Sequence, residues 1–164
     1  MDKELQVVGL RIGRETFGLP ISMVREIVRV PEITSVPNAP DYIEGVINLR
    51  GRIIPVVDLR KRFGEKATEP DKRNRIVVVE MENRRIGLIV NSASEVLKIP
   101  PSEIEQPNNV FQEGELDYIT GVGKLNGRLV ILLDLSRVLQ RGELGRLDEI
   151  AESVVPAGSA VRNY

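Results

Sequence analysis

The chain has 164 residues, with no cysteine, histidine or tryptophan, and its 23 basic and 24 acidic residues give a formal net charge of −1. The lack of cysteine excludes disulfides, thiolate nucleophiles and cysteine zinc sites. The lack of histidine excludes a Ser-His-Asp triad and the commonest metal ligand. The nearly neutral charge argues against a general nucleic-acid binder, but a carboxylate or lysine mechanism stays open.

The N-terminal residues MDKELQ are charged and lack the apolar core of a signal peptide. No run approaches the roughly 18 apolar residues that span a bilayer. The sequence therefore predicts a soluble, cytoplasmic protein without direct membrane insertion. We also expect no cofactor and no metal ion.

The first predicted elements are strands. Two apolar runs, VVGLRI and FGLPI, flank a polar turn at residues 13–15 and predict a β-hairpin. The next segment, SMVREIV, is either one helical turn or an irregular strand. The run LRGRIIPVV then crosses a glycine turn into an aliphatic strand, and a short helix-like stretch follows Asp58.

The second half of the chain repeats this order after a charged linker, residues 65–74. The runs IVVVEM and IGLIV predict another hairpin, SASEVLK follows, and Asn126-Gly127 is a strong signal for a hairpin turn. In the C-terminal tail, residues 142–164, Leu144, Leu147 and Ile150 are spaced to share one face of a helix.

The two halves are copies of one unit. Residues 41–59 and 117–135 align without gaps, 76 residues apart, and ten of the nineteen positions are identical. Upstream the offset is 69 residues, so that Glu26 matches Glu95, and a polar insertion of seven residues accounts for the difference. We therefore expect one unit at residues 5–64 and a second at 75–141.

About five short strands per unit fit a small barrel, because a barrel closes its own edges. The predicted fold is all-β, with two packed five-stranded barrels, short helices and a C-terminal helical tail; exchange of strands between the units is left open. Residues 53–57, 76–79 and 129–133 are apolar on both faces of their strands. The other barrel covers part of this surface, and we expect a partner protein to cover the rest.

Two segments carry a resemblance to a known family: residues 45–60, GVINLRGRIIPVVDLR, and FGLPISMVREI, which a proline-bounded loop and VPNAPDYI follow. They resemble the CheW-like family of chemotaxis coupling proteins, over roughly residues 5–140. The resemblance implies two SH3-like barrels and a non-catalytic adaptor at receptor arrays. It also implies two partners, the regulatory domain of the histidine kinase CheA and the cytoplasmic tips of transmembrane chemoreceptors.

The resemblance singles out Arg50 as a contact for receptor or kinase. Asn126 occupies its position in the second copy, which favours a role specific to the first; the alternative is a solvated turn arginine. Val24, Glu26 and Ile27 border the receptor-binding groove in this family. The alternative is core packing for Val24 and Ile27 and a surface charge for Glu26.

Three further residues are candidate partner contacts with strong structural alternatives. Gly45 either fills a positive-φ turn or lets a partner approach the backbone. Ile53 and Ile76 lie in the doubly apolar runs and are either core or partner surface. Asp58 and Asp134, by contrast, precede helix-like stretches and are expected to cap them, not to form a catalytic pair.

Three other functions remain as alternatives. A small barrel that binds nucleic acid would need exposed aromatics over a basic groove. A regulatory-domain fragment of a CheA-type kinase would share the fold, although the short tail makes the chain look like the stand-alone coupling protein. An enzyme would need a constellation such as a Walker motif or HExxH, and the sequence contains neither.

Overall fold

A computed structural model describes residues 4–64, 70–106, 118–139, 146, 147, 149 and 150. The elements of the first half are β1 (Leu5–Ile12), β2 (Glu15–Pro20), η1 (Ile21–Met23), β3 (Val24–Arg29), β4 (Ile43–Leu49), β5 (Arg52–Asp58) and α1 (Leu59–Arg62). Those of the second are β6 (Arg75–Met81), β7 (Arg84–Val90), β8 (Ser92–Ile99), η2 (Pro101–Glu103), β9 (Ile104–Glu105), β10 (Ile119–Leu125), β11 (Arg128–Leu133) and α2 (Leu135–Val138).

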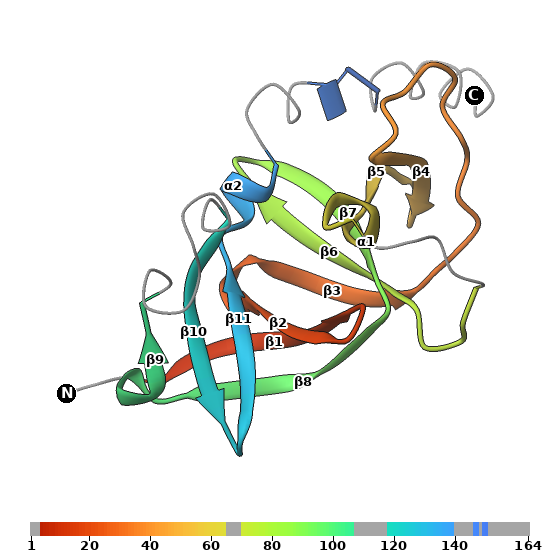
Figure 1. Ribbon diagram of the computed structural model, residues 1–164. Coiled ribbons are helices and arrows are strands. Elements are labelled where there is room, and N and C mark those ends of the chain that lie inside the picture. Colours follow the sequence, from red (N-terminus) through yellow and green to blue (C-terminus); the bar gives the residue numbers. More distant parts are fainter. Residues whose placement is uncertain (1–3, 65–69, 107–117, 140–145, 148, 151–164) are drawn as a thin grey trace.

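Within these residues the strands form two sheets, in the orders β8-β1-β2-β11-β10-β9 and β3-β6-β7-β5-β4 (Figure 1). The expected all-β fold of two barrel-like units is confirmed. Each sheet, however, combines both copies of the repeat. The hairpin β1–β2 of the first copy joins strands of the second, and β6–β7 of the second joins strands of the first. The hairpin of one copy is connected to the strands of the other by a parallel pair in each sheet: β2 with β11 and β7 with β5.

The predictions of hairpins and helix caps agree with the structure. The four hairpins β1–β2, β6–β7, β4–β5 and β10–β11 are present. The ambiguous segment SMVREIV begins in a single 3-10 turn, η1, and continues as a strand, β3. Asp58 and Asp134 accept hydrogen bonds from the backbone N–H of Arg60 and Ser136, so the expected helix caps are confirmed.

Three apolar clusters hold the molecule together. One lies between the two sheets and takes side chains from both; we call it the shared core, and Val8, Leu19, Val77 and Leu88 belong to it. The other two lie within the five-stranded sheet and within the six-stranded sheet. Successive residues of a strand point to opposite faces, so a strand between two clusters must be apolar throughout.

The burial of β6 corrects one expectation. Ile76 and Val78 point into the cluster of the five-stranded sheet, whereas Val77 and Val79 point into the shared core, and all four are at most 1% exposed. The chain itself therefore covers both faces of this strand. A partner protein is not needed to cover it, contrary to the sequence-based expectation.

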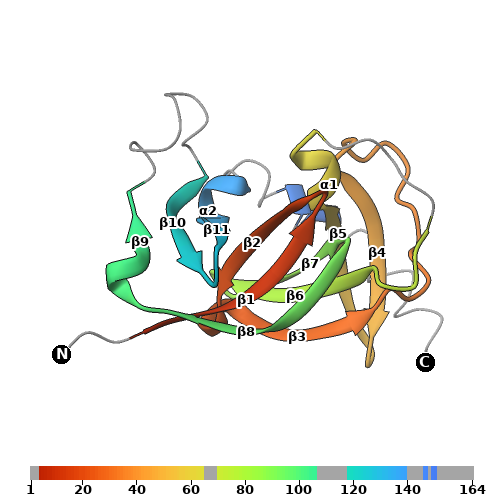
Figure 2. The same cartoon turned by 60° about the horizontal axis from the view of Figure 1, so that its bottom comes forward.

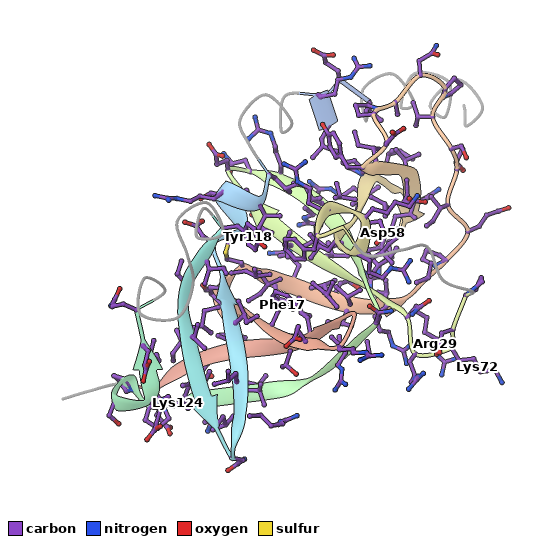
Figure 3. The ribbon with its side chains drawn as sticks, viewed as in Figure 1. Phe17, Arg29, Asp58, Lys72, Tyr118 and Lys124 are labelled. Atoms are coloured by element: carbon purple, nitrogen blue, oxygen red, sulfur yellow. The ribbon has the colours of Figure 1, made fainter. Side chains whose placement is uncertain are left out.

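Aromatic side chains of the two copies of the repeat stack on one another. The ring of Phe63, after α1, stacks on Phe17 and on Tyr118, with centroid separations of 5.3 Å and 4.9 Å. Figure 3 shows Phe17 and Tyr118 facing the middle of the molecule. Leu147 and Ile150 of the tail are buried in the shared core; Leu144 lies outside the described residues.

Candidate protein-interaction site

Arg50 occupies a backbone conformation that costs an arginine free energy. It and Gly51 form the two-residue turn between β4 and β5, with φ of 52° and 82°. The turn is supported by Asn48, whose Oδ1 accepts the N–H of Gly51 at 2.9 Å. The equivalent turn of the second copy has Asn126, at φ 51°, and asparagine tolerates this left-handed region better than arginine. The arginine is therefore better explained by its side chain than by the turn.

That side chain forms a bidentate pair with Glu26 of β3. Nη1 of Arg50 donates to Oε2 and Nη2 to Oε1, both at 2.7 Å. These hydrogen bonds lower the pKa of the Glu26 carboxyl and raise the pKa of Arg50. The Arg50 side chain stays 71% exposed, so its remaining N–H groups face solvent.

The pair links β3 to the turn of the β4–β5 hairpin, which belongs to the same sheet but is not adjacent to β3. β3 and the β4–β5 hairpin lie at opposite edges of the five-stranded sheet, and the ion pair joins them across the gap. The structure thus brings together two residues that the sequence analysis named separately.

Val24 and Ile27 lie on the face of β3 that is turned toward the shared core. Their register partners on β6 are Val79 and Val77, both of the shared core, and opposite residues in an antiparallel pair point to the same face. Val24 is half-buried against that core, whereas Ile27 is 38% exposed at the sheet edge. Ile27 is therefore open to a partner, and Val24 has mainly a packing role.

The second copy has an equivalent residue that was not among the sequence-based candidates. Val96 of β8 stands 69 residues after Ile27, is 43% exposed, and registers with Val8 of the shared core. Ala93, which matches Val24, is likewise half-buried against that core. The matched pair Glu26 and Glu95 already gave this alignment, so the repeat carried a signal for Val96.

The edge strands β3 and β8 therefore carry matching apolar positions, and we call Val24, Ile27, Ala93 and Val96 the β3/β8 strip. β8 contacts β6, the strand next to β3, so both edges border the same side of the shared core (Figure 2). Ile27 and Val96 are the exposed members of the strip, and Val24 and Ala93 connect them to the shared core. Such exposed apolar surface suits a protein partner.

The other three candidates are less accessible. Gly45 is buried at φ 147°, and a Cβ there would lie 2.1 Å from the carbonyl oxygen of Thr34. The backbone that approaches it is that of the chain itself. Ile53 is half-buried against the shared core. Ile76 is 0% exposed, so it is core and not partner surface in this structure.

The described residues contain no group of three or more acidic side chains arranged to hold a metal ion. Asp58 is buried against Arg60, with Nη2 of Arg60 3.0 Å from Oδ2. No helix in the described part of the chain is long and apolar enough to cross a bilayer.

Comparison with known proteins agrees with this architecture. The family model for the CheW-like domain matches residues 6–143. The chemotaxis protein CheW of Klebsiella aerogenes is 33% identical over 142 residues, which cover 87% of this chain and 86% of that protein. The chemotaxis protein CheW of Helicobacter pylori is 35% identical over 141 residues, 85% of this chain and 84% of that one.

A solved structure is similar in fold as well as in sequence. The crystal structure of the scaffolding protein TtCheW from Thermoanaerobacter tengcongensis superimposes with a TM-score of 0.76 at 36% identity. The match covers 87% of this chain and 96% of that one.

Proposed function

This chain belongs to the CheW-like family, and on that premise we propose that it is a non-catalytic adaptor of bacterial chemotaxis that couples chemoreceptors to the histidine kinase CheA. The observation that carries the proposal is the β3/β8 strip, whose members Ile27 and Val96 are exposed at equivalent positions of two edge strands. The relatives named above are chemotaxis proteins and a scaffolding protein. The role requires a cytoplasmic location, where the receptor tips and the kinase lie.

We assign the strip to the receptor tip. A helical hairpin presents apolar side chains along its length, and it can lay them against an apolar surface of matching extent. Ile27 and Val96 lie at equivalent positions of the repeat, so the strip offers similar contacts to each of two antiparallel helices.

We assign Arg50 to the contact with a carboxylate or backbone carbonyl of a partner. Two of its N–H groups bind Glu26, which fixes the plane of the guanidinium and leaves other donors exposed. A guanidinium held in this way loses little further side-chain entropy on binding, which favours a strong contact. Ile53 stays a proposed contact of lower weight, since it is only half-buried.

The experiment measures binding by isothermal titration calorimetry to two purified partners, a CheA regulatory domain and a receptor cytoplasmic hairpin. We expect the wild-type chain to bind both. Ile27→Ser and Val96→Ser should each weaken receptor binding by about tenfold, because each removes a large apolar contact from a protein interface. Arg50→Glu should weaken binding to at least one of the two partners.

The matched control is Leu129→Ser. Leu129 is 56% exposed on β11 and lies outside the strip, so its loss should leave receptor binding unchanged. Lack of binding to either partner by the wild-type chain would contradict the adaptor role. Equal losses with Leu129→Ser and Ile27→Ser would contradict the assignment of the strip.

Nucleic-acid binding has less support. Base stacking needs open aromatic faces, whereas the rings of Phe17, Phe63 and Tyr118 stack on one another. A gel shift with single-stranded RNA at physiological salt tests the alternative, and we expect no retarded band.

A further inference from the structure

A pocket opens at the far end of β3 from the Glu26–Arg50 pair. Its volume is about 690 Å³, within the range of sites that hold small organic molecules. Its apolar lining includes Val30, Ile33, Pro70 and Ile89. Val30 is 38% exposed, unusual for a large aliphatic residue in the described part of this chain.

The carboxylates that line the pocket are already paired. Asp71 accepts Nε and Nη2 of Arg73 at 3.1 Å and 2.9 Å, and these bonds hold the pKa of Asp71 well below its usual range. Glu44 pairs with Lys61. Both carboxylates are therefore neutralised by cations outside the pocket lining.

Two positively charged side chains of the lining do not form such ion pairs with described residues. Arg29 ends β3 and Lys72 stands in the loop before β6, and among the described residues neither side chain has a carboxylate partner. Figure 3 shows the two labelled side chains on the same side of the molecule. The pocket lining therefore carries a surplus of positive charge beside its apolar surface.

The loop that carries Lys72 is held firmly in place. Nη1 of Arg75 donates to the carbonyl oxygen of Lys72 at 2.7 Å, and the side chain of Asn74 donates to the carbonyl oxygen of Asn91 at 3.1 Å. These bonds fix the backbone from which the exposed Lys72 side chain projects.

Arg60 adds an unfilled donor. Its Nε and Nη2 bind Asp58, but its Nη1 is buried without a hydrogen-bond partner among the described residues, and Arg60 lines the pocket. A buried donor without a partner is costly, and an acceptor on a ligand would remove that cost.

We propose that this pocket binds a small amphipathic anion, with an apolar body over Val30, Ile33 and Ile89 and a carboxylate, sulfonate or phosphate group between Arg29 and Lys72. The anionic group supplies the charge that the lining lacks, and the apolar body covers surface that is otherwise open to water. The site is separate from the β3/β8 strip, so binding there does not depend on the proposed adaptor function.

The test uses 8-anilinonaphthalene-1-sulfonate, whose fluorescence rises when it leaves water, with the full chain. We expect saturable binding of one molecule per chain. Arg29→Glu and Lys72→Glu should each weaken it by about tenfold, since each reverses one of the two charges next to the sulfonate. N-phenyl-1-naphthylamine, which lacks the sulfonate, should bind more weakly and respond little to either substitution.

Two control variants locate the probe. Arg128→Glu reverses an exposed charge on the other sheet, and Val96→Ser removes apolar surface from the β3/β8 strip; neither should change the affinity. Thermal melts confirm that every variant is folded. Absence of saturable binding, wild-type affinity in Arg29→Glu and Lys72→Glu, or loss of binding in Val96→Ser would each overturn the proposal.

Discussion

The hairpin β4–β5 contains three residues at positive φ, Gly45, Arg50 and Gly51, and the first two serve different purposes. Gly45 is there because the backbone of Thr34 passes where a Cβ would lie, and Thr34 and Val46 exchange two backbone hydrogen bonds of 2.9 Å. Arg50 is there although its Cβ disfavours the conformation, and its side chain holds Glu26. The first residue lets the loop at Thr34 bridge to the edge strand β4, and the second holds the exposed pair with Glu26.

We expect Gly45→Ala to lower the free energy of unfolding by about 2–4 kcal/mol, because the added methyl group meets backbone atoms that cannot move away cheaply. Gly127→Ala is the matched control. Gly127 has φ 78° but no atom within 4 Å of the added Cβ, so only the backbone strain of about 1 kcal/mol remains. Urea unfolding of both variants measures the difference, and equal losses would contradict the steric explanation.

The Glu26–Arg50 pair makes a prediction about pH. The pKa of Glu26 is lowered in the folded chain, so the pair contributes at neutral pH and its contribution is lost as the pH falls through that lowered value. An NMR titration of the side-chain carboxyl should place its midpoint below the usual value for glutamate. In Arg50→Ala the midpoint should rise toward that usual value; an unchanged midpoint would mean that the pair does not form in solution.

At the scale of elements, the neighbouring strands β3 and β6 differ in burial. β6 lies between two apolar clusters and is buried on both faces, whereas β3 is the edge strand and alternates between half-buried and exposed side chains. Val24 and Ile27 share one face of β3 but differ in their distance from the shared core.

We expect Val24→Lys to lower the free energy of unfolding by about 2 kcal/mol, because it places an ammonium group against the shared core. Ile27→Lys should change stability by less than about 1 kcal/mol, since Ile27 is at the exposed edge. Thermal or urea unfolding distinguishes them. A large loss with Ile27→Lys would show that this residue is core and not contact surface.

The features that could be predicted from the sequence depend on residues that are close to one another along the chain. The duplication followed from identities, the hairpins from alternation and glycine turns, and the caps at Asp58 and Asp134 from their place before a helix-like stretch. The partners of β1–β2 and of β6–β7 could not be predicted, because both hairpins have the same local pattern. Whether Ile76 is core or partner surface was left open, because an apolar run does not reveal what covers it; the structure places it in the core.

The candidate site was predicted only in part for the same reason. Glu26 and Arg50 are 24 residues apart, and only the closure of the five-stranded sheet brings them together. Val96 could have been found by extending the alignment of Glu26 with Glu95 by one residue.

At the scale of the whole molecule, the two copies are interlocked. Each contributes its first hairpin to the sheet of the other, and the shared core takes side chains from both sheets. Neither copy alone retains its central strands or the surface that covers them.

We therefore expect fragments 1–64 and 70–164 to be unfolded separately, because each would expose half of the shared core and an unpaired sheet edge. Mixed in equal amounts, they should regain the β-sheet circular-dichroism signal. A cooperative unfolding transition in either isolated fragment would contradict the interlocked arrangement.

The most direct test of the adaptor role is whether the chain holds both partners at once. Sedimentation velocity of the chain mixed with a CheA regulatory domain and a receptor cytoplasmic hairpin should show one ternary species, heavier than either binary complex. This species should be lost with Ile27→Ser, while the binary complex with the kinase domain persists. If the mixture forms binary complexes alone, and the receptor hairpin and the kinase domain displace each other, the adaptor role is contradicted.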